Sequence, residues 1–389
     1  MDKIVKKRIL LLTTDFPPEI GGIQKILYTL SYGLNCKGYE IEVIAPYIKN
    51  CSEFDKKQNF KILRVPFFKL KKRFTILFWC LLLPYIILQR YNLVISGHIL
   101  TTPIGLIVKY LKNIPLITYT YALEIMDLRY KKIFGFLLRK SDRVIVLSDF
   151  TKSYIREIGV KNNTIKIYPG IDLNLFDKSK YKKDEIKREL GLNGKIILTT
   201  ICRLARKERY KGVDTIISIL PELRNKYQSI FYLVIGGGDD LENLKELAKN
   251  YNVSDIVLFT GNIDFDEIPK YLAISDIFIM VSKEIRTKNQ IKAEGLGVVF
   301  AEAQAMEIPT IGGRSGGIPD IVVENETGLL ADPFKPDDVR KKIEHLLDNP
   351  NLSNKLVMNA KKRVFQEFAN EIFIKRFENV IETLIKEEI

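Results

Sequence analysis

The stretch KIILTTIC, residues 195–202, has the length and composition of a short buried strand in the middle of a long chain. It repeats the pattern of RILLLTT, residues 8–14, because a loop and then a helical pattern follow each apolar run. From each point, short apolar runs alternate with segments that carry apolar residues at helical spacing. Strands that alternate with helices predict βαβ units and parallel sheets. A series that starts twice predicts two such domains.

The segment between the two series, residues 170–195, is polar and charged and predicts a linker followed by a short helix. We therefore expect an α/β protein with an N-terminal domain over 1–175 and a C-terminal domain over 176–362, both doubly wound. The amphipathic segment 363–389 predicts a last helix that crosses back to the first domain. Such folds bind ligands beyond the carboxyl ends of their strands, so two facing domains predict a cleft between them.

Composition places the chain among ordinary globular proteins. Its 389 residues suit two domains, and 46% hydrophobic with 28% charged residues argues against disorder. The four cysteines form no CxxC pair and the chain has only two histidines, so we expect neither a zinc site nor a disulfide framework. Scattered cysteines fit a reducing cytoplasm. The apolar run near the N-terminus is short and predicts the first strand, not a secretory signal.

The net charge of +14 is concentrated in the N-terminal part of the chain. Residues 1–175 hold 28 Lys and Arg against 13 Asp and Glu, a net charge of +15, whereas residues 176–389 hold 33 against 34, a net charge of −1. This asymmetry favours an anionic partner for the N-terminal domain, either nucleic acid or an anionic membrane surface. We find no nucleic-acid-binding motif around these charges, so a membrane is the better expectation.

Residues 67–90, FFKLKKRFTILFWCLLLPYIILQR, join a basic cluster to an aromatic-rich apolar run. The run contains Pro84 and falls short of the about 20 residues that span a bilayer. Three interpretations stay open: a buried helix pair, a helix in the membrane interface, and a transmembrane span. In the second, the basic cluster would face lipid headgroups. The cluster consists of Lys69, Lys71, Lys72 and Arg73.

Two loops at predicted strand ends suit an anionic ligand. Residues 15–22, DFPPEIGG, lie between the first strand and the first helix, where glycines let the backbone approach a ligand and the helix presents N–H groups. Residues 202–212, CRLARKERYKG, place five basic residues after the first strand of the second domain, which would suit a diphosphate. A plain strand-to-helix turn and a solvated charged loop are the respective alternatives.

Two further segments of the second domain carry candidate residues. GGGDD, residues 236–240, lacks the GxGxxG spacing of a dinucleotide fingerprint, so a nicotinamide enzyme is not supported. EGLGVVFAE, residues 294–302, would place Glu294 in a loop just before a helix and Glu302 more than a turn inside it. The glycines would expose N–H groups at the helix start. Alternatively, Glu294 interacts with the helix dipole and Glu302 faces solvent.

Taken in order, these motifs resemble the retaining glycosyltransferase family 4, whose GT-B fold has two Rossmann-like domains facing each other across a cleft. The resemblance covers nearly the whole chain. Its most specific part is the glutamate pair with seven residues between the two glutamates, followed by a Gly-Gly-x-Pro loop and a TGLL run. The matching segments are FPPEIGG, YPGIDLNLF, RL…KGVD, VIGGGDDLENL, EGLGVVFAE and SGGIPDIVVENETGLL.

The resemblance implies a role for each matching residue. Arg203, Lys211 and Glu294 would be catalytic. The two cations would neutralise the diphosphate leaving group as the glycosidic bond breaks. Glu294 would accept hydrogen bonds from hydroxyls of the donor sugar, and Glu302 from both ribose hydroxyls. The remaining donor-binding positions would offer backbone groups to the diphosphate or the sugar. These are Gly21, Gly22, Leu296, Gly297, Val298 and Val299.

This chain departs from the family pattern at two places. Arg203 and Lys211 stand further apart than the family's pair, which leaves Lys207 as an alternative to Lys211. In the first domain, the family often has a histidine in a Thr-His-Gly-x-Glu segment close to the reacting sugar, and here Tyr121 takes that position. His98 follows a different predicted strand. If the family's histidine contacts the donor, the tyrosine hydroxyl would do the same.

The resemblance also implies a mechanism that needs neither a metal nor another cofactor. In a retaining transfer on one face, a departing phosphate oxygen takes the acceptor's proton, and Arg plus Lys replace the charge of a metal. The insertion before Glu294 and the segment GGRSGGIPDIV are similar to bacterial phosphatidylinositol mannosyltransferases and lipopolysaccharide or O-antigen enzymes. That similarity favours GDP-mannose as donor, with UDP-sugars as the alternative.

The expected activity is therefore hexosyl transfer to a lipid-linked saccharide or glycolipid acceptor in cell-surface glycan biosynthesis. The enzyme would lie in the cytoplasm, peripheral on the inner face of the cytoplasmic membrane, and hold anionic lipid through residues 67–90. A protein of another class stays open: a catalytically impaired protein that only binds a nucleotide sugar or membrane, with Tyr121 marking the lost activity. A sugar-nucleotide epimerase of the same fold is the less favoured third.

Overall fold

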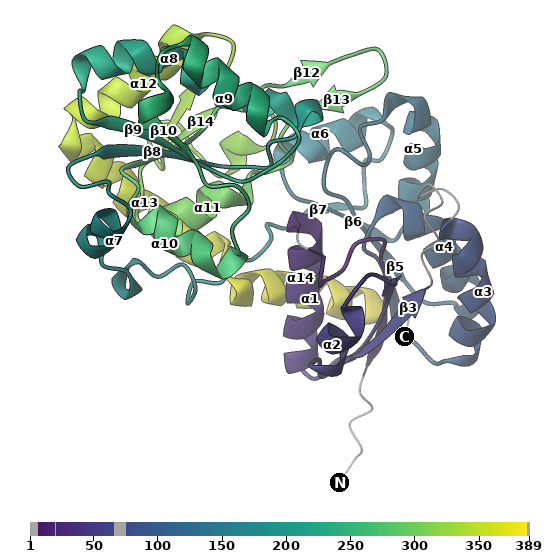
Figure 1. Cartoon of the computed structure of the whole chain (residues 1–389). Helices are drawn as coiled ribbons and strands as arrows, with labels where there is room; N and C mark the ends of the chain where they lie inside the picture. Colours follow the sequence, from purple (N-terminus) through teal and green to yellow (C-terminus); the bar gives the residue numbers. More distant parts are fainter. Residues whose placement is uncertain (1–6, 20, 66–74, 387–389) are drawn as a thin grey trace. The chain divides into compact units, whose positions relative to one another are not determined.

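Two compact units make up the chain in a computed structural model, which describes residues 7–19, 21–65 and 75–386 (Figure 1). Unit 1 consists of residues 1–170 and 370–389, and unit 2 consists of residues 171–369. The division therefore falls at Gly170 instead of residue 175, and the last segment begins at Asn370 instead of residue 363. The basic cluster within residues 67–90, from Lys69 to Arg73, lies outside the described residues.

Unit 1 is a seven-stranded, wholly parallel sheet in the order β3-β2-β1-β4-β5-β6-β7. Its strands are β1 (Arg8–Leu12), β2 (Glu40–Pro46), β3 (Lys61–Val65), β4 (Leu93–Ser96), β5 (Leu116–Tyr119), β6 (Arg143–Val146) and β7 (Thr164–Lys166). Its helices are α1 (Gly22–Cys36), α2 (Cys51–Lys56), α3 (Thr75–Leu88), α4 (Thr102–Lys112), α5 (Lys131–Lys140), α6 (Asp149–Glu157) and α14 (Asn370–Lys386).

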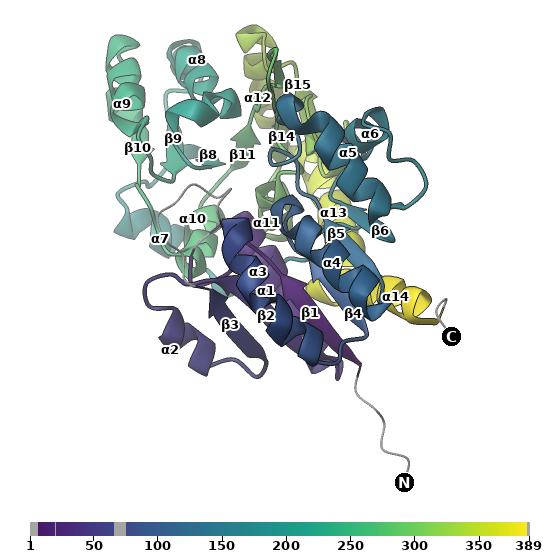
Figure 2. The same ribbon diagram turned by 90° about the vertical axis from the view of Figure 1, so that its right-hand side faces the viewer.

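Unit 2 has a six-stranded parallel sheet in the order β10-β9-β8-β11-β14-β15. Its strands are β8 (Ile196–Ile201), β9 (Ile230–Ile235), β10 (Val257–Phe259), β11 (Ile277–Met280), β14 (Thr310–Gly313) and β15 (Leu329–Ala331). Its helices are α7 (Lys183–Glu189), α8 (Val213–Lys226), α9 (Leu241–Asn250), α10 (Ile268–Ala273), α11 (Val298–Ala305), α12 (Pro336–Asp348) and α13 (Pro350–Glu367). In Figure 2, α8, α9 and α12 lie on one side of this sheet and α10 and α11 on the other.

The predicted pair of parallel, doubly wound sheets is confirmed. Each strand order reverses once, between β1 and β4 in unit 1 and between β8 and β11 in unit 2. The loops that follow these four strands therefore border the two switch points, where open parallel sheets bind ligands. The segment before Glu294, expected as a plain loop, contains an antiparallel hairpin of β12 (Ile285–Arg286) and β13 (Ile291–Lys292).

The last helix, α14, packs against α1 within unit 1. A Cβ atom on Gly33 of α1 would lie 2.5 Å from the Ile374 side chain, so the two helices approach closely there. Glu382 accepts hydrogen bonds from Lys7 at 2.6 Å and from Tyr39 at 2.5 Å. The C-terminal segment thus belongs to the core and the polar contacts of the N-terminal sheet.

Within residues 67–90, the chain from Thr75 to Leu88 is one helix, α3, that continues through Pro84. The end of α3 is tied to the sheet by the buried carboxylate of Glu42, which accepts hydrogen bonds from Tyr85 at 2.6 Å and Tyr91 at 3.0 Å. Among the described residues, no helix combines the length and the apolar character needed to cross a bilayer.

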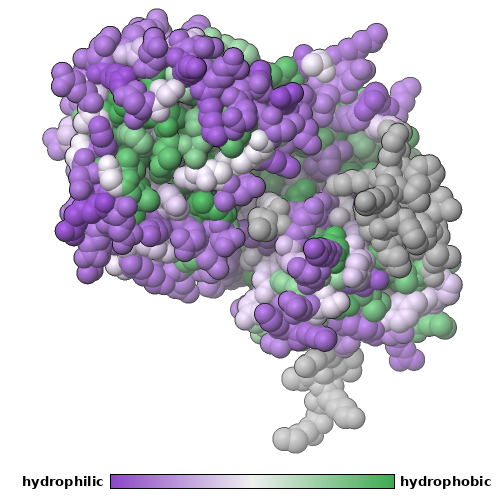
Figure 3. All heavy atoms as spheres, viewed as in Figure 1, coloured by the Kyte–Doolittle hydropathy of each residue, from purple (hydrophilic) through white to green (hydrophobic). Residues whose placement is uncertain are grey.

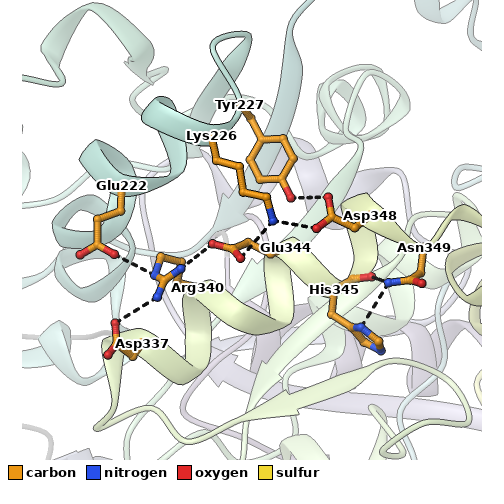
Figure 4. A network of polar contacts seen from close by, with 9 residues as sticks. All are labelled: Glu222, Lys226, Tyr227, Asp337, Arg340, Glu344, His345, Asp348 and Asn349. Atoms are coloured by element: carbon orange, nitrogen blue, oxygen red, sulfur yellow. Dashed lines mark hydrogen bonds and ion pairs between the residues drawn. The ribbon is translucent and has the colours of Figure 1, made fainter.

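Unit 2 has a mostly hydrophilic surface on the face shown in Figure 3, with hydrophobic residues gathered in a smaller area. A surface network joins α8 to α12 on this unit (Figure 4). Arg340 contacts Glu222 at 2.9 Å and Glu344 at 2.6 Å, and Lys226 contacts Asp348 at 2.7 Å. These pairs lie at the surface, so their contribution to stability is small.

Candidate functional site

The candidate residues of unit 2 gather at the switch point between β8 and β11. The basic loop, residues 202–212, follows β8, and the hairpin segment that ends at Glu294 follows β11. The two are in contact, because the Lys292 ammonium donates to the Lys207 carbonyl at 3.2 Å and Lys211 contacts Glu294. Segments that are some eighty residues apart in sequence thus form one site at the carboxyl ends of the strands.

Two of the five basic residues in this loop hold it against the GGGDD segment. Arg209 forms a bidentate pair with the buried carboxylate of Asp240, at 2.6 and 2.5 Å. The Arg206 backbone N–H donates to Asp239 at 2.9 Å. The weak GGGDD motif therefore has a structural role here, because its two carboxylates fix the basic loop. Neither arginine was a predicted site residue.

Arg203 and Lys211, the predicted cations, differ in their surroundings. The Arg203 side chain is 67% exposed and contacts the buried Glu208 at 3.0 Å. The Lys211 side chain is only 16% exposed and lies 3.2 Å from the Glu294 carboxylate, whose side chain is 18% exposed. Lys207, the alternative to Lys211, is exposed. Lys211 is thus the lysine that the fold places beside Glu294.

The Lys211–Glu294 pair keeps the lysine charged. Burial is the largest single influence and alone would lower the pKa of the Lys211 ammonium. The carboxylate of Glu294, together with neighbouring groups such as Tyr210 and Glu208, outweighs burial and raises that pKa above its ordinary 10.5. Burial raises the pKa of the neighbouring Cys202 thiol to about 12, so Cys202 is a protonated thiol at neutral pH and no nucleophile. The site therefore offers a fixed positive charge next to a hydrogen-bond acceptor.

Glycines on two sides fix the backbone of this pair. Gly212 adopts φ +80°, and a Cβ atom there would lie 2.4 Å from the carbonyl oxygen of Val281, so the loop needs glycine directly after Lys211. A Cβ atom on Gly317 would lie 2.1 Å from the carbonyl of Gly295, and the Gly317 N–H donates to the carbonyl of Glu294 at 2.8 Å. The Gly-Gly-x-Pro loop thus holds the backbone at Glu294.

The helix α11 begins where the sequence predicted, with Leu296 and Gly297 just before it and Val298 and Val299 in its first turn. Glu302 lies inside the helix and is 4% exposed, so the alternative in which Glu302 faces solvent is wrong. The first N–H groups of a helix have no partner within it, and they favour anions. The start of α11 therefore offers backbone N–H donors, and the buried carboxylate of Glu302, one turn further along, offers an acceptor.

The glycines of unit 1 lie at the start of α1, after the loop that follows β1. The backbone of Gly21 is extended, with φ 174°, and a Cβ atom on Gly22 would meet nothing within 4 Å. Packing in unit 1 therefore does not require glycine at either position, although a Cβ atom on Gly21 would displace the Gln24 side chain. Open space at a helix start is compatible with the predicted approach of a ligand.

Tyr121 lies just after β5, and its hydroxyl donates to the Gly97 carbonyl at 3.0 Å. Its ring is buried and stacks on Tyr119 at 5.0 Å between ring centroids. Burial raises the pKa of Tyr121 well above its ordinary 10.0. Glu124 orders this turn by accepting from the N–H groups of Tyr121 at 2.6 Å and Ala122 at 2.8 Å. The hydroxyl proton of Tyr121 is thus used within the fold.

Three features of these sites were not predicted from the sequence. Arg209 and Asp240 fix the basic loop, and the hairpin β12–β13 leads directly into Glu294. His98 lies in the turn whose preceding residue, Gly97, contacts Tyr121. Only the strand order, which places β4 beside β5, brings His98 and Tyr121 to neighbouring strand ends.

Among the described residues, no group of three or more His, Cys, Asp or Glu side chains could hold a metal ion.

Two family models match the chain, one for each half. The model described as Glycosyltransferase Family 4 matches residues 20–175, and the model described as Glycosyl transferases group 1 matches residues 182–363. The boundary between the matched ranges lies close to the boundary between the two units.

Known relatives match most of the chain. The GDP-mannose-dependent alpha-(1-6)-phosphatidylinositol monomannoside mannosyltransferase of Mycolicibacterium smegmatis is 29% identical over 361 residues, which cover 88% of this chain and 90% of the relative. The alpha-monoglucosyldiacylglycerol synthase of Streptococcus pneumoniae is 26% identical over 345 residues, which cover 83% and 75%. The crystal structure of Anabaena Alr3699/HepE in complex with UDP matches with a TM-score of 0.81 at 17% identity, covering 97% of this chain and 100% of that one. The last match shows the shared fold.

Proposed function

The chain belongs to the family 4 glycosyltransferases, and from that premise we propose that it transfers a hexosyl unit, with mannose favoured, from a nucleotide-diphosphate sugar to a lipid-linked saccharide or glycolipid. The enzyme retains the configuration of the transferred sugar. Support for the acceptor class comes from relatives whose names specify phosphatidylinositol mannosides and glucosyldiacylglycerol. The acceptor belongs to the synthesis of cell-surface glycans, of which lipopolysaccharide is one case.

The observation that carries this proposal is the pair of Lys211 and Glu294 at the β8–β11 switch point. Lys211 stays positive beside the carboxylate, and Arg203 extends from the same loop into solvent. A leaving diphosphate gains negative charge as the sugar departs, so two cations aimed at it stabilise the transition state. Glu294 accepts hydrogen bonds from sugar hydroxyls, and Glu302 accepts them from the ribose.

In the proposed reaction, the bond from the anomeric carbon to the diphosphate breaks while a new bond to the acceptor oxygen forms on the same face. The acceptor's proton passes to the departing phosphate oxygen, so no side-chain base is needed. The engaged hydroxyl and raised pKa of Tyr121 agree with a mechanism in which this residue moves no proton. We expect transfer to persist in EDTA, and a strict requirement for manganese or magnesium would contradict the mechanism.

The proposed membrane contact extends from α3 to α4 and α5, which pack in series on unit 1. We define the α3–α5 surface by its exposed large hydrophobic residues. These are Ile87, Leu88, Ile107, Tyr110, Leu111, Ile133 and Phe136. The exposed cations Lys132, Arg139 and Lys140 lie on α5 as well. Apolar side chains beside cations on the basic half of the chain suit an anionic bilayer on the cytoplasmic side.

Vesicle flotation tests this surface. Wild-type chain should float with anionic vesicles more than with neutral ones, and replacing Tyr110 and Phe136 by serine should reduce flotation. Phe365 is half exposed on α13 of unit 2, and the matched control Phe365→Ser should float like wild type. Neutralising Lys69–Arg73 tests the contribution of that segment separately. Equal flotation with neutral and anionic vesicles would contradict the membrane proposal.

Thermal shift with GDP-, UDP- and ADP-sugars tests the donor. A ligand at a hundred times its dissociation constant stabilises the fold by about 2.7 kcal/mol. We expect GDP-mannose to give the largest shift, and a larger shift with a UDP-sugar would favour the alternative donor. Release of nucleoside diphosphate only with acceptor present separates a transferase from an epimerase. Loss of transfer in Glu294→Ala, with donor-independent stability retained, separates an enzyme from a mere binding protein.

A further inference from the structure

The residues between the two proposed cations of the basic loop are anchored one by one. We call this stretch, residues 207–210, the brace. The Lys207 carbonyl accepts a hydrogen bond from the Lys292 ammonium of β13 at 3.2 Å. The Tyr210 carbonyl accepts one from the backbone N–H of Lys283, in the segment after β11, at 2.6 Å. The two ends of the brace are therefore bound to the chain that connects β11 to α11.

The second residue of the brace restrains one of the two cations. Glu208 is 7% exposed, and its carboxylate lies 3.0 Å from the guanidinium of Arg203. The Glu208 N–H donates to the Ala205 carbonyl at 2.7 Å, so the backbone of this residue is held as well. The Arg203 side chain is mostly exposed, and its contact with a held carboxylate restricts the directions in which its guanidinium points.

The third residue of the brace is held by the start of α9. Arg209 forms a bidentate pair with Asp240, and Asp240 is 2% exposed. Asn243 donates to the same carboxylate at 2.7 Å, and the Asp240 N–H donates to the Leu204 carbonyl at 2.9 Å. A bidentate pair fixes direction as well as distance, and this carboxylate has further bonds of its own. Arg209 therefore has a defined place in the loop.

These anchors reach Lys211 through the backbone. The Gly212 N–H donates to the Arg209 carbonyl at 3.2 Å, which closes the turn that contains Lys211. Lys211 is thus preceded by anchored residues and followed by a glycine that approaches the Val281 carbonyl closely. A catalytic charge must stand at the right distance from the reacting group, and a misplacement of about 1 Å can cost about 10²-fold in rate. The place of the brace therefore limits what Lys211 contributes.

We propose that Arg209 and Asp240 are positioning residues, whose ion pair holds the brace so that Lys211 faces the leaving diphosphate. Glu208 has the same role for Arg203. This inference rests on the proposed function, because Lys211 meets a leaving diphosphate only in a transferase. Arg209 is not a third cation for the donor, since its guanidinium is engaged by the buried carboxylate.

Two substitutions test the ion pair, each made in wild type and in Lys211→Met. Asp240→Asn removes the charge at nearly constant shape, and Arg209→Lys keeps the charge but loses the bidentate geometry. The matched control is Asp276→Asn, just before β11 and so at the other end of the sheet. Asp276 also holds several partners, because it accepts from the Ile197 N–H at 2.8 Å and from two lysine ammonium groups.

If the pair acts through Lys211, its effect on rate should disappear when Lys211 is absent. We expect Asp240→Asn to lower kcat about tenfold in wild type and about twofold at most in Lys211→Met, with little change in the KM for GDP-mannose. Arg209→Lys should show the same pattern with a smaller loss. The loss of stability from Asp240→Asn, measured by urea unfolding, should be equal in both backgrounds. Asp276→Asn should lose stability and keep the kcat of wild type.

An equal fractional loss of kcat in both backgrounds would overturn the proposal, because the pair would then act independently of Lys211. A wild-type kcat in folded Asp240→Asn and Arg209→Lys would overturn it as well. If Asp240→Asn does not fold, Arg209→Lys carries the same cycle, since that side chain is 55% exposed.

A wild-type chain that transfers sugar from no donor refutes the proposed function instead. The same cycle is then measured on the dissociation constant of GDP by calorimetry. A loss of affinity from Asp240→Asn that is confined to the background with Lys211 supports the positioning role, and an equal loss in both backgrounds overturns it. A wild-type chain that neither transfers sugar nor binds GDP or UDP would refute both proposals.

Discussion

Replacing Lys211 with methionine removes one charge from the site at nearly constant volume. Glu294 would then keep its place on a backbone held by Gly317, with no cation at 3.2 Å. Breaking a fully buried pair in this way costs about 3–5 kcal/mol. Because both side chains retain some exposure, 16% and 18%, we expect a smaller loss of stability, about 2 kcal/mol.

The effect on catalysis should be larger than the effect on folding. A cation directed at the leaving diphosphate acts mainly in the transition state, so kcat should fall about 10²–10³-fold, or about 2.7–4 kcal/mol. The raised pKa of Lys211 means that its charge contributes fully at any pH below 10.5 and is lost only as pH rises through the folded pKa. The stability difference between variant and wild type should therefore stay constant from about pH 6 to 9.

Denaturant unfolding and initial-rate kinetics check both parts of this prediction. The variants are Lys211→Met, Glu294→Gln and the double variant, and a coupling energy follows from the cycle. We expect the double variant to be more stable than the sum of the single losses implies. A kcat for Lys211→Met within threefold of wild type, at unchanged fold, would refute the role of this lysine. A coupling energy near zero would refute the importance of the ion pair.

Three further predictions concern the framework around the site. Gly33→Ala should cost about 1–3 kcal/mol by overpacking α1 against Ile374, and Ile374→Val should restore part of that loss in chemical unfolding. Burial opposes the charge of Glu42, but hydrogen bonds from Tyr85, Tyr91 and Lys61 together hold its pKa below 4.5. The stabilisation by Glu42 is therefore present above pH 4.5 and lost as pH falls below it, so Glu42→Gln should destabilise at pH 7 and converge with wild type in acid titration. Arg340→Ala, in the network of Figure 4, should cost no more than about 1 kcal/mol, and less in high salt, when melted at two ionic strengths. A larger, salt-independent loss would show that the network is more than a surface feature.

The sequence predicted both sheets because buried parallel strands are short apolar runs, and β1 and β8 begin within a residue of the predicted starts. It did not predict the hairpin β12–β13, whose strands have two residues each and carry no alternating apolar pattern. It also left the surroundings of Glu302 open. The helix α11 is buried from Phe300 to Ala305, so it has no polar face whose spacing would show which way Glu302 points.

Contacts between distant segments depend on strand order, which no local pattern contains. The resemblance named Lys211 and Glu294, but their pairing follows from β8 lying beside β11. Likewise, β4 lies beside β5, and this places Tyr121 against the residue before His98. The sequence correctly indicated that His98 and Tyr121 follow separate strands. It could not show that the ends of these two strands lie side by side.

The most direct test of the central claim is a transfer assay with the purified full chain. Labelled GDP-mannose would be incubated with phosphatidylinositol-containing vesicles in EDTA, and the label in the organic extract measured. We predict label in the lipid fraction with wild type and almost none with Glu294→Ala at comparable thermal stability. Equal lipid labelling by the two proteins would contradict the assigned site, and no labelling by wild type from GDP-mannose or any UDP-sugar would contradict the proposed activity.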